Sequence, residues 1–141
     1  LDATEYICPA IEIVDKRYHN FYGNICDNVS DNAFFHSYIL GDTIVRPYDI
    51  PLEEVGLTVY HNGLQSLSGT GAGVMGHPAE GVIWLANRML DVGMPLKAGE
   101  LILSGSFTGG ILAAPGDNFE AVYSDTLGRI RVNFEPAPSE S

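Results

Sequence analysis

A single segment of this chain, residues 77–93, has the pattern of a long helix, and it lies between two groups of short strand-like segments. Its apolar positions repeat at helical spacing: Val82, Leu85, Ala86 and Met89. Pro78 suits the first helical position, where its missing N–H costs nothing, and Gly93 with Pro95 ends the run. Strands, one helix and further strands, in that order, predict an α+β domain built on a mixed, curled β-sheet, with the helix stripe packed on it.

Alternating apolar and polar residues predict the strands on both sides of this helix. The expected strand segments are residues 10–15, 34–40, 56–69, 99–107, 118–124 and 129–135. Residues 56–69 are the clearest hairpin, because alternating apolar positions flank Asn62-Gly63, the pair that a tight type I′ turn prefers. Residues 2–7 predict a short helical turn, which Pro9 brings to an end.

The composition restricts the class of partner. The 141 residues suffice for one domain, and 45% of them are hydrophobic, which indicates a folded protein. There are 18 acidic residues against 7 lysines and arginines, a net charge of −11. This balance argues against nucleic acid and anionic membranes as partners, because both require clustered basic residues. No apolar run approaches the roughly 18 residues that a membrane-spanning helix needs.

The two cysteines predict a cellular compartment, and the first residues predict that the sequence is part of a longer polypeptide. Cys8 and Cys26 form no C-x-x-C pair, and we predict that they are reduced thiols of a cytoplasmic protein. The chain begins at Leu1, in a segment that already has a helical pattern and has nothing before it to pack against. We therefore expect it to be a piece of a longer polypeptide.

Glu12 is the most unusual residue, because it lies between Ile11 and Ile13 in an apolar strand segment. An ionised carboxylate left unpaired in apolar surroundings costs several kcal/mol or more. Glu12 must therefore reach solvent, a positive partner or a metal ion. A hard cation requires several oxygen ligands, so one carboxylate does not complete a metal site. The histidines show no ligand spacing either: His19, His36, His61 and His77.

Two glycine-rich segments are candidates for ligand binding. "GTGAGVMG", residues 69–76, contains G-x-G-x-x-G but follows an antiparallel hairpin, so it favours a flexible loop near a pocket over a dinucleotide site. "LSGSFTGG", residues 103–110, places hydroxyl groups among glycines after an apolar strand segment. Hydroxyls and free amides on such a turn can hold a carboxylate or enolate oxygen, although a simple loop explains the pattern nearly as well.

Five segments together resemble a known family. They are "TEYICPAIEIVDKRY", "DNVSDNA", "GAGVMGHPAEGVIWLAN", "PLKAGELILSGSFT" and "APGDNFEA", in this order along the chain. They are similar to the 2-hydroxypenta-2,4-dienoate hydratase and 4-oxalocrotonate decarboxylase family, within the fumarylacetoacetase-like superfamily. The resemblance implies that residues 1–134 are the C-terminal part of a fumarylacetoacetase-like catalytic domain with a β-roll fold, and that residues 135–141 form a solvated tail.

The resemblance also implies a site. Family enzymes hold Mg²⁺ or Mn²⁺ with three glutamates, and Glu12 in "PAIE" matches the third of them. The other two, an E-x-E pair, and the lysine used for proton transfer would lie upstream of Leu1. Ser106 and the loop residues Asp31 and Asn32 match substrate-binding positions. Phe34 stands where many members have a pocket serine, which puts the choice of substrate in doubt.

The function implied by the resemblance is a lyase of aromatic meta-cleavage catabolism. A hydratase would add water to a 2-hydroxy-2,4-dienoate, or to a 2-oxo-enoate diacid, and give a 4-hydroxy-2-oxo acid. The alternatives are a decarboxylase of the 4-oxalocrotonate type and a non-catalytic, truncated partner subunit of such an enzyme. The implied partners are a small 2-hydroxydienoate or 2-oxo acid and either further copies of the chain or a related subunit.

Overall fold

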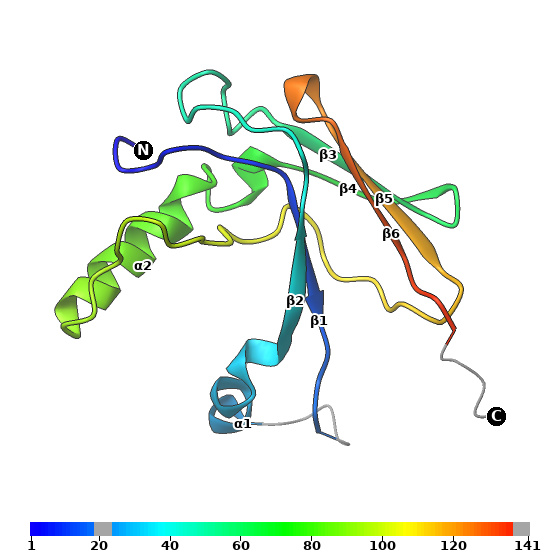
Figure 1. The fold of residues 1–141 in the computed structure, drawn as a ribbon, viewed down its shortest axis with the longest axis horizontal. Helices are drawn as coiled ribbons and strands as arrows, with labels where there is room; N and C mark the ends of the chain where they lie inside the picture. The colour runs from blue at the N-terminus through cyan, green and yellow to red at the C-terminus, as the bar shows by residue number, and fades with distance from the viewer. Residues whose placement is uncertain (19–23, 137–141) are drawn as a thin grey trace.

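The computed structural model describes residues 1–18 and 24–136, and it confirms an α+β fold with one long helix (Figure 1). The strands are β1 (Ala10–Val14), β2 (Phe35–Leu40), β3 (Gly56–His61), β4 (Leu64–Thr70), β5 (Asn118–Tyr123) and β6 (Arg129–Asn133). The α-helices are α1 (Ile25–Ser30) and α2 (Ala79–Asp91). Three short 3₁₀ turns complete the described elements: η1 (Asn32–Phe34), η2 (Gly71–Gly73) and η3 (Asp125–Leu127).

The strands form two antiparallel sheets. β1 pairs with β2, and the larger sheet has the order β4-β3-β5-β6. Figure 1 shows the β1–β2 pair lying across the larger sheet. The buried apolar side chains come from β3, β5, β6 and the segments that lead into β3 and β6: Leu52, Val55, Leu57, Ala121, Leu127 and Ile130. The core therefore belongs mainly to the four-stranded sheet.

The β3–β4 hairpin has the predicted turn. Asn62 and Gly63 have φ of 51° and 78°, both in the left-handed region that a type I′ turn requires. The Asn62 side-chain amide donates to Asp117 Oδ1 at 2.8 Å, and the Asn118 amide donates to Asn62 Oδ1 at 2.9 Å. These bonds tie the hairpin turn to the turn that precedes β5.

The small sheet is joined to the large one near the start of β1. The Tyr123 hydroxyl on β5 donates to the carbonyl oxygen of Ala10 at 2.9 Å. Gly41, just after β2, lies so close to its neighbours that an added Cβ would stand 3.3 Å from side-chain atoms of both Ile130 and Pro9. The start of β1, the strand that carries Glu12, is therefore hydrogen-bonded to β5, and the residue that follows β2 lies close to β6.

The helical turn predicted at residues 2–7 is wrong. The chain makes one reverse turn, in which the Thr4 amide donates to the Leu1 carbonyl oxygen at 2.8 Å, and then runs extended. Ile7 and Val45 form a β-bridge with reciprocal hydrogen bonds of 2.8 and 2.9 Å. Because pairing with a distant segment satisfies the backbone here, tertiary contact overrides the local helical preference.

Helix α1 was not predicted, although the sequence contains its start signal. The Asn24 side chain accepts hydrogen bonds from the amides of Cys26 and Asp27, and the Asp27 side chain accepts one from the Asn24 amide. This reciprocal pattern is a capping box with Asn and Asp in place of the commoner Ser and Glu. The helix is only six residues long, too short to show apolar periodicity.

The strand predicted at residues 99–107 does not form. Residues 101–113 contain no helix or strand, and within the described chain the segment 101–107 makes no backbone–backbone hydrogen bond. Its sequence has the alternation and apolar character of a strand, but a strand exists only when a neighbour accepts and donates its hydrogen bonds. The partner that this segment needs is absent from the described residues.

Helix α2 has the predicted position but not the predicted packing. None of its residues is buried, and it extends away from both sheets (Figure 1). The expected apolar stripe is only half-buried: Val82, Leu85, Ala86 and Met89. The neighbour of the helix is the strandless segment, since an added Cβ at Gly81 would lie 3.3 Å from the Ser104 carbonyl oxygen.

Candidate functional site

Glu12 lies on β1 directly opposite Tyr38 of β2, on the exposed face of the small sheet. Its carboxylate makes no ion pair or hydrogen bond with any described residue. Ile11 and Ile13 turn to the other face and are half-buried, as the alternation predicts. Glu12 was expected to reach solvent, a positive partner or a metal ion, and among the described residues its carboxylate is exposed to solvent.

The described residues do not form a complete metal centre. Among them there is no group of three or more histidines, cysteines, aspartates or glutamates that could hold a metal ion. The oxygen donor of Glu12 suits a hard divalent cation, and it is exposed, with no partner in the described chain. A cation such as Mg²⁺ nevertheless needs about six ligands, so a single carboxylate does not retain it against water.

Asp31, between α1 and β2, is the one buried charged residue among those described, at 5% exposure. Arg17 satisfies it: Arg17 Nη1 donates to Asp31 Oδ1 at 2.7 Å, and the Arg17 amide donates to Asp31 Oδ2 at 3.2 Å. These hydrogen bonds and the positive charge hold the pKa of the Asp31 carboxyl below its usual value. Both carboxylate oxygens of Asp31 therefore bind Arg17.

Asn32 and Phe34 follow Asp31 in a tight turn. The Asn32 side chain is exposed and makes no hydrogen bond within the described chain, so its amide is available to a ligand. Phe34 is half-buried, and its carbonyl oxygen accepts a hydrogen bond of 2.8 Å from the amide of Asp15, just beyond β1. This bond brings the loop of Asp31 and Asn32 to the end of the strand that carries Glu12.

Ser106 lies in the segment without regular structure, where its hydroxyl is exposed and accepts a hydrogen bond of 3.3 Å from the Thr108 amide. The next residue, Phe107, meets the ring of Tyr123 edge-on at 6.4 Å between centroids. Tyr123 in turn bonds to Ala10, two residues before Glu12. The segment of Ser106 is thus linked through one tyrosine to β1, although no hydrogen bond within the described chain joins Ser106 to Glu12.

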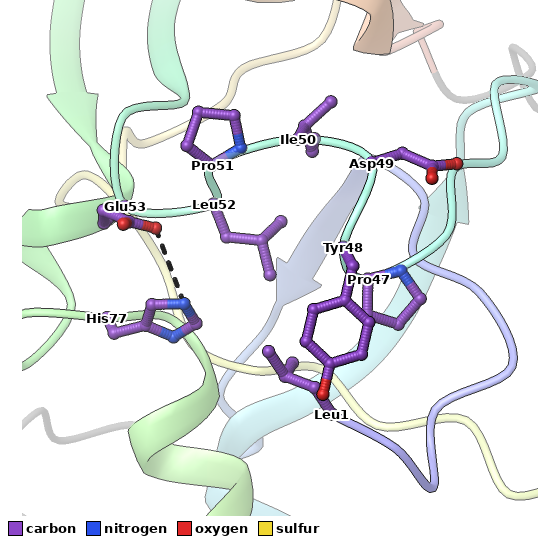
Figure 2. Close-up of a pocket in the computed structure, with 9 residues that line it drawn as sticks. All are labelled: Leu1, Pro47, Tyr48, Asp49, Ile50, Pro51, Leu52, Glu53 and His77. Atoms are coloured by element: carbon purple, nitrogen blue, oxygen red, sulfur yellow. Dashed lines mark ion pairs between the residues drawn. The ribbon is translucent and has the colours of Figure 1, made fainter.

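A pocket of about 310 Å³ lies at the start of α2 and includes His77, the residue that follows the glycine-rich loop predicted to lie near a pocket, but its other lining residues were not predicted (Figure 2). Its lining consists of Leu1, Pro47, Tyr48, Asp49, Ile50, Pro51, Leu52, Glu53 and His77. Figure 2 shows His77 and Glu53 facing each other, with His77 Nε2 3.6 Å from Glu53 Oε2. His77 Nδ1 accepts a hydrogen bond of 3.0 Å from the Ala79 amide, which leaves Nε2 as the nitrogen that faces the pocket.

This pocket contains none of the predicted site residues Glu12, Asp31, Asn32 and Ser106. The His-Pro-Ala sequence at a helix start was the available signal, and it indicates the structural role that His77 has here, which is to cap the first turn of α2. The carboxylate of Glu53 opposes binding of an anion at this helix end. We assign the pocket no ligand.

The other described histidines, His36 and His61, lie outside this pocket. His36 is exposed on β2. His61 at the hairpin tip pairs with Asp117, with 3.1 Å between Nε2 and Oδ2, and stacks on the ring of Phe119 at 4.5 Å. His19 lies outside the described residues.

The described cysteines form no disulfide bond with each other. Cys8 is half-buried, Cys26 is exposed, and both thiols are free. Among the residues described, no helix has the length and apolar character that crossing a bilayer requires.

Comparison with known proteins shows relatives along nearly the whole chain. The chain is 38% identical over 139 aligned residues to 2-oxo-hept-4-ene-1,7-dioate hydratase of Escherichia coli, covering 94% of this chain and 52% of that protein. It is 40% identical over 134 residues to 2-hydroxyhexa-2,4-dienoate hydratase of Comamonas testosteroni, covering 95% of this chain and 50% of the relative. The chain therefore spans about half the length of these relatives.

A solved structure has the same fold. The 4-oxalocrotonate decarboxylase from Pseudomonas putida G7, complexed with magnesium and adipate, superimposes with a TM-score of 0.84 and 34% sequence identity, over 92% of this chain and 49% of that one. Residues 1–135 match the family described as fumarylacetoacetate (FAA) hydrolase C-terminal. This match covers more than nine-tenths of the sequence, and the likeness of fold agrees with it. The chain therefore belongs to the fumarylacetoacetate hydrolase C-terminal family.

Proposed function

We propose that this chain is part of a divalent-metal-dependent hydratase that adds water to a 2-hydroxy-2,4-dienoate or a 2-oxo-enoate diacid and gives a 4-hydroxy-2-oxo acid. The observation that carries the proposal is the 38–40% identity to two hydratases along almost the whole chain. The chain spans only about half of those relatives, and the proposal is that the complete activity also uses residues outside positions 1–141.

In this proposal Glu12 supplies one carboxylate ligand to Mg²⁺ or Mn²⁺, and the remaining ligands and the proton-transfer lysine come from outside residues 1–141. The exposed and unpaired state of the Glu12 carboxylate supports this role, because no described residue competes for it. When bound, such a cation would supply Lewis-acid stabilisation of negative charge on the substrate oxygens.

The chain's own polar groups would orient the substrate. The free amide of Asn32 and the hydroxyl of Ser106 are exposed, and both suit the carboxylate groups of a small 2-oxo acid. Asp31 contributes indirectly, since Arg17 binds both of its oxygens. We further propose that the protein is cytoplasmic and that it acts as a homo-oligomer or together with a related subunit.

A decarboxylase is the second candidate, because the solved relative of matching fold is a 4-oxalocrotonate decarboxylase. Both reactions would use a small 2-oxo acid and a divalent cation, so the architecture of the described half does not separate them. Phe34, two residues after Asn32 in the same turn, adds apolar bulk near the proposed substrate groups and is the residue on this chain where we expect substrate choice to be decided.

Activity assays on the complete native protein test the proposal. With Mg²⁺ or Mn²⁺ present, 2-hydroxypenta-2,4-dienoate should lose its diene absorbance, and Glu12→Gln should abolish that loss. Release of CO₂ from 4-oxalocrotonate without hydration of the dienoate would assign the decarboxylase instead. Turnover of neither of these substrates, nor of 2-oxo-hept-4-ene-1,7-dioate, would contradict both enzymes and leave the non-catalytic partner subunit.

Metal binding gives a test that is independent of turnover. Residues 1–141 alone should bind Mg²⁺ only weakly in titration calorimetry, because one carboxylate competes poorly with water. Tight binding by this piece would contradict the proposal that the site is shared with residues outside it. Glu12→Gln is the matched variant, since it keeps the size of the side chain and removes its charge.

A further inference from the structure

The loop between α1 and β2 holds three consecutive non-glycine residues in the left-handed region of the backbone. Asn32, Ala33 and Phe34 have φ of 52°, 53° and 65°. L residues avoid this region because Cβ crowds a neighbouring carbonyl oxygen, and the residues that adopt it normally occur singly. Strain of this kind persists only where the surrounding structure enforces it, and it is concentrated at functional sites. A specific contact must therefore hold this turn.

Arg17 contacts the chain on both sides of the turn. Its Nη1 donates to the Asp31 carbonyl oxygen at 3.2 Å, and its Nη2 donates to the Phe35 carbonyl oxygen at 2.9 Å. Asp31 and Phe35 are the residues immediately before and after the three strained positions. One planar guanidinium thus joins the two ends of the turn, while the buried carboxylate of Asp31 fixes the guanidinium itself. Lysine, a compact point charge, lacks the planar fork that this arrangement uses.

The turn determines where the Asn32 side chain is presented. Arg17 lies three residues beyond the end of β1, the strand of Glu12, so the same short stretch carries the proposed metal ligand and the contact that holds the turn. We propose that Arg17 is a positioning residue, which keeps residues 32–34 left-handed and thereby orients the free amide of Asn32 beside β1. The predicted effect of Arg17 on substrate binding rests on the proposed function, whereas its predicted effect on the conformation of the turn does not.

The first experiment measures the turn directly. Backbone Cα and Cβ chemical shifts and HN–Hα couplings of residues 32–34 should report left-handed geometry in the native protein and lose it in Arg17→Gln. Arg46→Gln is the matched control, because the Arg46 side chain makes no hydrogen bond or ion pair with any described residue, and it should leave the values unchanged. A folded Arg17→Gln protein that keeps the left-handed values overturns the proposal. If Arg17→Gln fails to fold, Arg17→Lys takes its place, because lysine keeps a positive charge beside Asp31 but lacks the planar guanidinium. A folded Arg17→Lys protein that keeps the left-handed values likewise overturns the proposal.

The second experiment uses a double-mutant cycle on 2-hydroxypenta-2,4-dienoate. Arg17→Gln and Asn32→Ala should each raise KM about tenfold with kcat within about twofold, and the double variant should be no worse than the poorer single variant. Additive losses, or an unchanged KM in Arg17→Gln, would overturn the positioning role. If the native protein turns over no substrate, the proposed function fails, and the chemical shifts still decide whether Arg17 holds the turn.

Discussion

The four-stranded sheet and the region formed by α2 with residues 93–113 are both rich in apolar residues, but only the sheet has a core. The sheet pairs all of its strands and contributes buried Leu57, Ala121 and Ile130. The other region has no buried residue in its helix and no strand, and it leaves large apolar side chains exposed: Ile83, Trp84, Leu90, Met94, Leu101 and Leu112. Apolar composition is thus common to both, and backbone pairing distinguishes them.

The total surface agrees with this contrast. The chain exposes 10,160 Å², whereas a compact monomer of 15.2 kDa exposes roughly 7,100 Å² by the usual scaling with mass. The excess is of the size of a large protein interface. Helix α2, which has no buried residue, and the strand-like segment, which has no backbone–backbone hydrogen bond in the described chain, both contribute to this exposed area. The sheet thus buries apolar side chains of its own, whereas the described residues leave the second region uncovered.

Hydrogen exchange should show the largest difference between the two regions. In residues 1–141 alone, amides of β3 and β5 should exchange at least about a thousandfold more slowly than those of Leu101–Phe107, because only the strands have paired backbone groups. In the complete native protein the amides of this segment should become protected. Equal protection of the two regions in the 141-residue chain would remove the distinction.

The same substitution placed in each region should have unequal effects on stability. Leu57→Ala, on the central strand β3 at 8% exposure, should lower the free energy of unfolding by about 3 kcal/mol. Leu90→Ala, on α2 at 64% exposure, should change it by less than about 0.5 kcal/mol. Urea unfolding followed by circular dichroism is the measurement, because the single tryptophan, Trp84, is exposed on α2 and reports poorly on the core. Similar losses from both variants would show that α2 is packed after all.

Glycine substitutions test the turns of the two regions. Gly63→Ala should lower the free energy of unfolding by about 1 kcal/mol, since Gly63 has φ of 78° in the hairpin turn, which L residues avoid. No other atom lies within 4 Å of an added Cβ, so the cost comes from the backbone conformation alone. Gly109→Ala is the control in the strandless segment, where φ is not positive and no atom lies within 4 Å. Equal effects would mean that the hairpin turn is not under conformational constraint.

The smallest effect concerns pH. The pKa of Asp117 is lowered, first by the hydrogen bond from Asn62 and then by the Ala114 amide, with a smaller contribution from His61. A lowered pKa in the folded state means that the resulting stability is present above the ordinary value of about 3.9 and is lost as pH falls through the lower folded value. Thermal unfolding of Asp117→Asn should therefore lose part of the acid sensitivity of the native chain. An unchanged profile below about pH 4 would show that this link between the hairpin and β5 does not matter to stability.

Local patterns predicted much of the fold. All six strands β1 to β6, the type I′ turn and the position of α2 follow from alternation, from the Asn62-Gly63 pair and from a proline and a glycine at the helix ends. The segment 99–107 and the region of residues 2–7 were predicted wrongly. In both cases the outcome depends on whether a distant segment supplies hydrogen bonds, and local sequence does not contain that information.

The candidate site, like the fold, was predicted only in part from the sequence. Glu12 was singled out because a carboxylate in an apolar strand is costly, and the structure shows it exposed, with no partner among the described residues. Its role in binding a metal stays a prediction, as do the substrate contacts of Ser106, Asp31 and Asn32. The bond between Arg17 and Asp31 was not predicted, because fourteen residues separate the two and neither belongs to a periodic pattern.

By itself, the sequence determined the type and order of most elements, the hairpin turn and the family, since these depend on neighbouring residues and on motifs in a fixed order. The tertiary structure alone decided that α2 and the strand-like segment remain uncovered, that Arg17 joins both ends of a strained turn, and that Glu12 faces solvent. The physical reason is that these features depend on which distant groups meet. Hydrogen bonds and burial between segments far apart in the chain are set by the assembled fold and have no local signature.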